Sequence, residues 1–298
     1  MEDVESALER LENIRTVEPI LGALRTVSLG SWQAAIRQRS GVQAYARRLL
    51  ALLPGLLPHL PEQRRGERQR PAAPDTVAVL VIGSERGLCG QFNEAVAAHA
   101  AHYLRDQAAA GTAVHLMAFG SKAVQALHHV ECPPAWSRKL SVTALPTFGM
   151  ASELTREWLS RYEAHALDAV DVIYNTYRGP GSYQPAVERL IPPQLPPTPG
   201  PPSSDLWPPL TVETDPLGLY VRIVEQWSAV TLHGALLNSA AAEHSMRYQM
   251  MEGAAQNAER LIDELTIVVQ TARREAITKE MQELAAGAGL LGRQRPSD

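Results

Sequence analysis

The feature that most constrains this chain is a long run without proline between Pro216 and Pro296. Proline removes a backbone donor and clashes inside a helix, so its absence over this distance permits one long helix. Apolar or small side chains recur along the run at steps of three and four, which is the spacing of a helix face. About 75 residues at roughly 1.5 Å each make ~110 Å of helix, far more than an ordinary globular helix. The sequence therefore predicts a C-terminal coiled-coil helix within residues 210–298.

The N-terminal residues 1–53 carry the same spacing and predict a second, shorter helix. An internal proline costs about 3 kcal/mol in a helix, so we expect a kink near residues 15 to 19, at Pro19. Two terminal helices around a compact insert pair most simply as an antiparallel coiled coil. The apolar stripe of the first helix is formed by Val4, Leu8, Leu11, Ile14, Val17, Leu21, Leu24 and Val27.

Between the two helices, residues 76–191 alternate strand-like and helix-like patterns. The segment TVAVLVIG is a continuous β-branched run, typical of a strand buried in a parallel sheet. Three such strands alternate with helical segments, and PAVERLIP is a candidate fourth. This alternation predicts a small α/β domain with a mainly parallel sheet, inserted into the coiled coil.

Two proline-rich segments join these parts, residues 54–75 and residues 192–209. Both compositions predict extended, solvated linkers. The first segment also carries four arginines, which could alternatively bind an acidic partner or lipid headgroups. The second could alternatively be a ligand for a proline-reading domain.

Charge and composition exclude several functional classes. The formal net charge is −4 and the pI is about 6.2, which argues against nucleic acid as the main partner. Two cysteines, Cys89 and Cys132, exclude a disulfide scaffold and a four-cysteine zinc site. The most apolar stretch, residues 226–242, contains Gln226, His233 and Asn238, so we expect no direct membrane insertion.

The turn GSERGLCGQFN, residues 83–93, follows the first strand and is the best candidate for chemistry. Glycine-rich turns can hold phosphate, but the spacing of Gly83, Gly87 and Gly90 fits neither dinucleotide nor P-loop patterns. Cys89 has no histidine close in sequence to act as a base, so a packed thiol is favoured over a nucleophile. We expect no catalytic residue, metal site or cofactor in this chain.

Three blocks of the sequence resemble the gamma subunit of F-type ATP synthases: RLENIRTVEPILGALRTVS, VIGSERGLCGQFN, and the final segment from EHSMRYQMMEG to AAGAGLL. The resemblance covers nearly the whole chain in order. It implies an antiparallel coiled coil of N- and C-terminal helices with an inserted Rossmann-like α/β domain that binds no nucleotide. Pro19, Glu85 and the pair Arg273-Arg274 depart from the family pattern, which suggests a divergent member, such as the gamma subunit of an alternate F-type ATPase.

The resemblance implies a central rotor shaft that couples ion flow through a membrane ring to ATP synthesis or hydrolysis. The implied partners are the alpha and beta subunits of the catalytic head, the epsilon subunit and the membrane c-ring. The implied location is peripheral, at the cytoplasmic face of the bacterial inner membrane. Partner contacts are expected at Arg15, Leu24, Arg25, Glu243, Arg247, Asn257, Arg273, Arg274, Thr278 and Glu280.

Two other functional classes remain open on the residues alone. A nucleotide-binding α/β enzyme with helical arms would use the glycine turn and bind ATP, ADP or NAD. A coiled-coil adaptor would hold an assembly together without turning.

Overall fold

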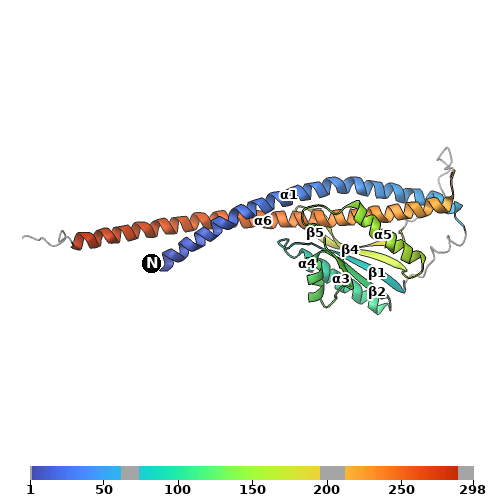
Figure 1. Ribbon diagram of the computed structural model, residues 1–298, viewed down its shortest axis with the longest axis horizontal. Helices are drawn as coiled ribbons and strands as arrows, with labels where there is room; N and C mark the ends of the chain where they lie inside the picture. Colours follow the sequence, from blue (N-terminus) through green and yellow to red (C-terminus); the bar gives the residue numbers. More distant parts are fainter. Residues whose placement is uncertain (1, 62–73, 195–211, 288–298) are drawn as a thin grey trace, which may run out of the picture. The chain divides into compact units, whose positions relative to one another are not determined.

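The computed structural model describes residues 2–61, 74–194 and 212–287 (Figure 1). Its contacts divide the chain into two compact units, which we describe separately. The terminal unit comprises residues 1–26 and 250–298, and the central unit comprises residues 27–249. The helices are α1 (Glu2–Leu56), the 3-10 turn η1 (Leu57–His59), α3 (Phe92–Ala109), α4 (Ser121–His129), α5 (Phe148–Glu163) and α6 (Pro216–Gly287). The strands are β1 (Thr76–Ile82), β2 (Ala113–Phe119), β3 (Trp136–Arg138), β4 (Ala169–Gly179) and β5 (Ser182–Ile191).

The central unit contains a five-stranded sheet in the order β3-β2-β1-β4-β5. The first four strands in this order are parallel, and β5 runs antiparallel to β4, as its hairpin connection requires. Strand β1 lies in the middle and is buried from Val77 to Ile82, as its continuous apolar run predicts. The pairing of β1 with β4 ends at Ile82 and Tyr174, and β4 continues beyond this point to Gly179.

Helices cover both faces of the sheet (Figure 1). On one face, α3 and α4 pack against alternate residues of β1, among them Val79 and Val81. On the other face, α5 contributes Trp158 and α6 contributes Leu232 and Leu236. Helix α6 is therefore part of the core of the α/β domain.

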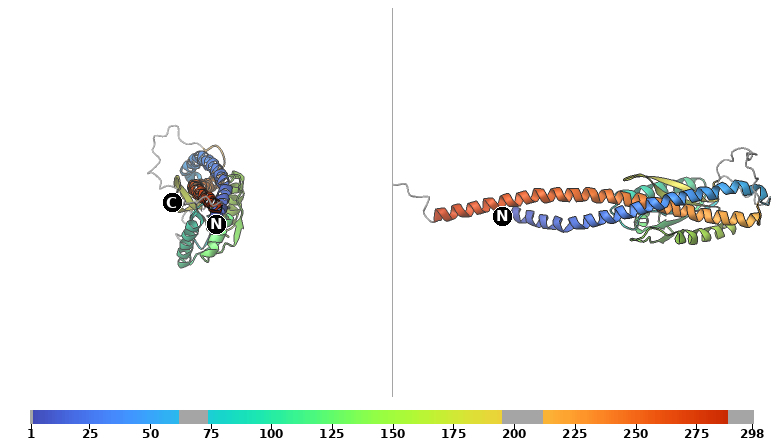
Figure 2. Two further views of the ribbon diagram at one scale, coloured as in Figure 1. Left: turned by 90° about the vertical axis from the view of Figure 1, so that its left-hand side faces the viewer. Right: turned by 90° about the horizontal axis from the view of Figure 1, so that it is seen from above.

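Helices α1 and α6 also pair with each other inside the central unit, where the views show them side by side (Figure 2). Ala35 of α1 packs with Ala240 and Ala241 of α6. Farther along α1, Leu53 packs in a cluster with Ile223 of α6. Later residues of α1 thus meet earlier residues of α6, so the pair is antiparallel. Together with the mixed sheet, this confirms the predicted fold class.

The terminal unit is a helical pair in which few side chains are buried. The Arg25 guanidinium of α1 donates to the Glu252 carboxylate of α6 at 2.9 Å. Toward its end, α6 is almost wholly exposed from residue 273 to residue 287. The buried apolar residues of this unit are Ala7, Leu11, Met251, Ala255, Ala258 and Val269.

Helix α1 continues through Pro19, as the helical spacing of residues 1–53 predicts, and the kink expected near residues 15 to 19 stays a prediction. The structure departs from the predicted elements in two places. Helix α1 passes Pro54 and ends at Leu56, beyond the predicted end at residue 53. Strand β3 is not predicted from the sequence, because three residues are too few for a periodic signal. The four-arginine cluster at 64–70, most of the proline-rich segment 192–209 and the last residues of the predicted C-terminal helix lie outside the described residues.

Candidate functional site

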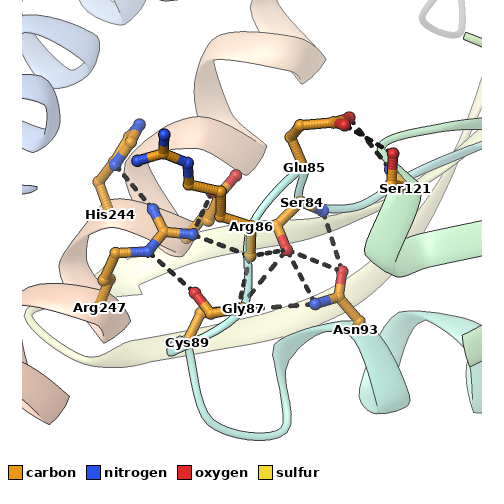
Figure 3. A network of polar contacts seen from close by, with 10 residues as sticks. Ser84, Glu85, Arg86, Gly87, Cys89, Asn93, Ser121, His244 and Arg247 are labelled. Atoms are coloured by element: carbon orange, nitrogen blue, oxygen red, sulfur yellow. Dashed lines mark hydrogen bonds and ion pairs between the residues drawn. The ribbon is translucent and has the colours of Figure 1, made fainter. Parts of the chain in front are cut away.

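The glycine turn lies at the carboxyl end of β1, where open α/β sheets usually bind ligands (Figure 3). The turn begins at Gly83, where only a hydrogen fits. A Cβ atom at this position would lie 2.5 Å from the Cβ of Ala123 on α4. Glycine here allows β1 to end in close contact with the neighbouring helix.

Buried hydrogen bonds hold the turn in place (Figure 3). The Ser84 backbone N–H donates to Asn93 Oδ1 at 2.9 Å, and Asn93 Nδ2 donates to Ser84 Oγ at 2.9 Å. Asn93 Nδ2 also donates to the Cys89 thiol at 3.6 Å. Burial raises the pKa of Cys89, so the thiol stays protonated, as expected for a packed side chain.

Glu85 connects the turn to the start of α4. Its carboxylate accepts hydrogen bonds from the Ser121 hydroxyl at 2.6 Å and from the Ser121 backbone N–H at 3.1 Å. It also accepts from the Leu140 backbone N–H at 3.0 Å. Partial burial would raise the pKa of Glu85, but these hydrogen bonds outweigh burial and lower it. A fixed carboxylate therefore occupies the N-terminus of α4, where the helix dipole favours negative charge.

Arg247 of α6 binds the other side of the turn (Figure 3). Its guanidinium donates to the backbone carbonyls of Arg86 and Gly87, each at 3.1 Å, and to the Glu243 carboxylate at 2.6 Å. The Arg247 side chain is only 8% exposed. The turn thus presents carbonyl oxygens to an internal cation, which is the opposite of the N–H cradle that an anion needs.

Two titratable neighbours of Arg247 complete this cluster. Burial raises the pKa of Glu243, and the adjacent guanidinium partly offsets that shift. Arg247 also donates to His244 Nδ1 at 3.2 Å. Burial, with the positive charge of Arg247, lowers the pKa of His244 to about 4, so this imidazole is neutral at pH 7.

A small cavity lies between the end of β1, the loop 140–146 and α6. Its volume is about 40 Å³, whereas one water molecule needs roughly 10–15 Å³. The cavity therefore has room for a few water molecules and not for a nucleotide. We conclude that the glycine turn is a structural junction between the sheet and α6.

The residues predicted to contact partners fall into two groups. Glu243 and Arg247 belong to the central unit, where they are buried and bind each other and the turn. The others belong to the terminal unit: Leu24 is half-buried, Arg25 forms its ion pair with Glu252, and the remaining residues are exposed. These exposed residues are Arg15, Asn257, Arg273, Arg274, Thr278 and Glu280.

On α6, the Thr278 hydroxyl donates to the Arg274 backbone carbonyl at 2.8 Å. Arg273 and Arg274 lie on an exposed face of α6, and among the described residues none forms an ion pair with either side chain.

Sequence reasoning did not single out the side chains that hold this junction together. Ser84 and Asn93 lie within the quoted turn, but their mutual hydrogen bonds depend on how the turn folds. From the sequence, Asn238 is simply one polar residue in an apolar stretch. In the structure it is 4% exposed and bound to two other elements. An amide side chain in an apolar helix face is expected to be buried, and a buried polar group needs a hydrogen-bond partner. That pattern could have identified Asn238 from the sequence.

Among the described residues, the helices include none that is both long enough and apolar enough to cross a membrane.

Known proteins are similar to this chain over nearly its full length. A family model described as ATP synthase matches residues 4–291. An ATP synthase gamma chain of Synechococcus elongatus is 28% identical, with 98% of this chain and 99% of the relative covered. An ATP synthase gamma chain of Chloroflexus aurantiacus is 26% identical, with 95% and 96% covered.

Solved structures give the same result for the fold. A chain of the Euglena gracilis mitochondrial ATP synthase, in an assembly described as OSCP/F1/c-ring, has a TM-score of 0.62 at 17% identity, with 100% of this chain and 99% of that chain covered. A chain of the Tetrahymena thermophila mitochondrial ATP synthase, described as central stalk and c-ring, has a TM-score of 0.57 at 20% identity. It covers 79% of this chain and 99% of its own length.

Proposed function

Because the chain belongs to the ATP synthase family, whose model matches residues 4–291, we propose that it is a gamma subunit and forms the central rotor shaft of an F-type ATP synthase. Its relatives over nearly the full length are ATP synthase gamma chains. In this role the chain couples ion flow through a membrane ring to ATP synthesis or hydrolysis in a catalytic head. The chemistry belongs to the assembled complex, and this chain transmits rotation.

The observation that carries this proposal is the uncovered apolar surface at the end of α6. Ile277 is 57% exposed, Met281 is 66% exposed and Leu284 is 73% exposed. Large apolar side chains gathered in this way are a common mark of a protein interface. A slim helix that carries them suits insertion into a cavity formed by other subunits.

The partners follow from this role. We propose that the terminal unit contacts the alpha and beta subunits of the catalytic head. We further propose that the α/β domain contacts the epsilon subunit and the c-ring, so that the complex sits peripherally at the cytoplasmic face of the membrane. The relatives' assemblies, which include F1 and the c-ring, support this arrangement.

Within the terminal unit, Arg273, Arg274, Thr278 and Glu280 are the proposed contacts with the head. The two arginines are exposed, and a guanidinium binds carboxylates or carbonyls in a fixed fork. Arg273→Ala and Arg274→Ala should assemble normally and lower ATP-driven ion pumping in the reconstituted complex. Parent-like ATP hydrolysis and ion pumping in both variants would show that these side chains do not contribute to the function of the complex.

Co-purification with head and ring subunits tests the proposed partners, and a single-molecule rotation assay tests turning. A complex that contains this chain but does not rotate would instead support the adaptor. Micromolar binding of ATP, ADP or NAD by the isolated chain would support the nucleotide-binding enzyme. The turn geometry argues against that alternative, because Asn93 and Glu85 already accept from the backbone N–H groups of Ser84 and Ser121.

A further inference from the structure

A rotor shaft with an attached α/β domain needs a junction that resists twisting between the sheet and the two helices. Apolar contacts such as those of Leu232 and Leu236 against the sheet are non-directional, so they resist sliding weakly. Hydrogen bonds to buried groups fix both distance and direction, and breaking them leaves unsatisfied polar atoms. A buried polar side chain that joins α1, α6 and the sheet would therefore fix the junction against twisting.

Asn238 of α6 joins all three. Its Oδ1 atom accepts from the Arg39 guanidinium of α1 at 2.9 Å and from the Tyr177 backbone N–H of β4 at 3.0 Å. The residue is 4% exposed, so both bonds lie away from water. One of the two donors carries a charge, which makes that bond stronger than a neutral one.

The topology explains why β4 offers a donor at this point. The ladder between β1 and β4 ends at Tyr174, and β4 continues to Gly179 without a β1 neighbour. The backbone of this extension needs other partners, because buried N–H groups are almost always hydrogen-bonded. Asn238 supplies the acceptor that β1 no longer provides for Tyr177.

Aromatic packing surrounds the same junction. The Arg39 guanidinium lies 5.5 Å from the centre of the Tyr177 ring. The Trp32 ring of α1 lies 6.2 Å from the Tyr177 ring of β4 and 5.9 Å from the Tyr248 ring of α6. The same three elements therefore meet twice, once through Asn238 and once through Trp32.

We propose that Asn238 is a positioning residue for torque transmission: it clamps β4 to the paired helices α1 and α6, so that rotation of the α/β domain turns the shaft without slip. This inference rests on the proposed function of the chain as a rotor shaft. The clamp consists of Asn238, Arg39 and Tyr177, with Trp32 and Tyr248 packed beside it.

The test uses the reconstituted complex with a bead attached to the α/β domain through a cysteine introduced at exposed Ala109 of α3. Asn238→Leu keeps the branching at Cγ and the number of side-chain heavy atoms, and removes the acceptor. Asn238→Asp keeps an oxygen that accepts from both donors. Ser228→Ala is the matched control, because Ser228 is also buried on α6 and its long 3.5 Å bond reaches the Leu190 carbonyl alone.

We expect Asn238→Leu to lower the torsional stiffness between bead and head and to reduce ion-driven ATP synthesis, while unloaded ATP hydrolysis stays close to that of the parent. Asn238→Asp should restore stiffness, and Ser228→Ala should match the parent. Unchanged torsional stiffness in Asn238→Leu would overturn the proposed clamp, even if the melting temperature of that variant falls. An equal loss of stiffness in Ser228→Ala would overturn it as well.

Arg39→Met covers the case in which Asn238→Leu does not assemble. It removes the α1 arm of the clamp and leaves the bond from Tyr177 to Asn238 intact. A partial loss of stiffness supports the clamp, and parent-like stiffness overturns it. A parent complex that does not rotate at all would instead refute the proposed function, so the two failures are distinguishable.

Discussion

The terminal and central units are built on the same two helices, yet they differ in what the helices cover. In the central unit, α6 packs against both α1 and the sheet, and buries polar side chains such as Asn238 and Arg247 with partners. In the terminal unit, most of α6 faces solvent, and apolar side chains such as Met281 lie exposed. Where the apolar side chains of a helix are buried within the same chain, the helix stabilises the fold. Where they stay exposed, they mark a surface that can bind a partner.

The largest expected effect tests whether stability resides in the central unit. Trp158 is 1% exposed in its core, so Trp158→Ala should lower the free energy of unfolding by about 4 kcal/mol, through lost burial and a cavity. Ile277→Ala in the terminal unit should change it by less than ~0.5 kcal/mol, because Ile277 is 57% exposed. Urea denaturation of the isolated chain measures both. Similar losses would break the distinction between the units.

The next effect concerns the buried charge pair. Arg247→Met should destabilise the chain by about 3 kcal/mol, because it leaves the Glu243 carboxylate buried without its cation. The double variant Glu243→Met, Arg247→Met should regain part of that loss, since apolar replacements of buried pairs are often tolerated. A double variant as unstable as Arg247→Met would show that the bonds to the turn carbonyls, not the charge pair, carry the stability.

A smaller effect appears as a dependence of stability on pH. The pKa of His244 is about 4 in the folded chain and about 6.5 when unfolded, so the unfolded state binds more protons between these values. Stability should therefore fall by about 2 kcal/mol between pH 7 and pH 5. His244→Gln should flatten that slope, while His129→Gln, at the exposed end of α4, should leave it unchanged. An identical slope in both variants would assign the dependence to other groups.

The smallest effect concerns the ion pair of the terminal unit. The side chains of Arg25 and Glu252 are 41% and 33% exposed, so Arg25→Ala should cost only about 0.5 kcal/mol. That cost should shrink further in 1 M salt, because exposed charges are screened. A cost of several kcal/mol, measured by the same denaturation at low and high salt, would show that the terminal unit depends on this pair for its own folding.

Much of the architecture is readable from the sequence, because periodicity and proline placement act locally. The run after Pro216 predicts α6, and the β-branched segment beginning at Thr76 predicts β1. Hydrophobic spacing fixes which face of each element is apolar, so the alternating pattern also indicates a parallel sheet covered by helices. Pro19 lies inside α1, as the helical spacing of residues 1–53 predicts, and the kink expected from its local cost stays a prediction.

Tertiary structure alone decided the partners of individual polar side chains. The partner contact expected of Arg247 stays a prediction, whereas the structure shows its guanidinium donating to carbonyls of Arg86 and Gly87, about 160 positions away in the chain. Asn238 likewise meets Arg39 and Tyr177 from elements distant in sequence. A hydrogen bond forms only within about 3 Å, and which distant groups come that close depends on how the sheet and helices pack. Local pattern therefore determined the elements of this protein, while long-range packing determined what its buried polar residues bind.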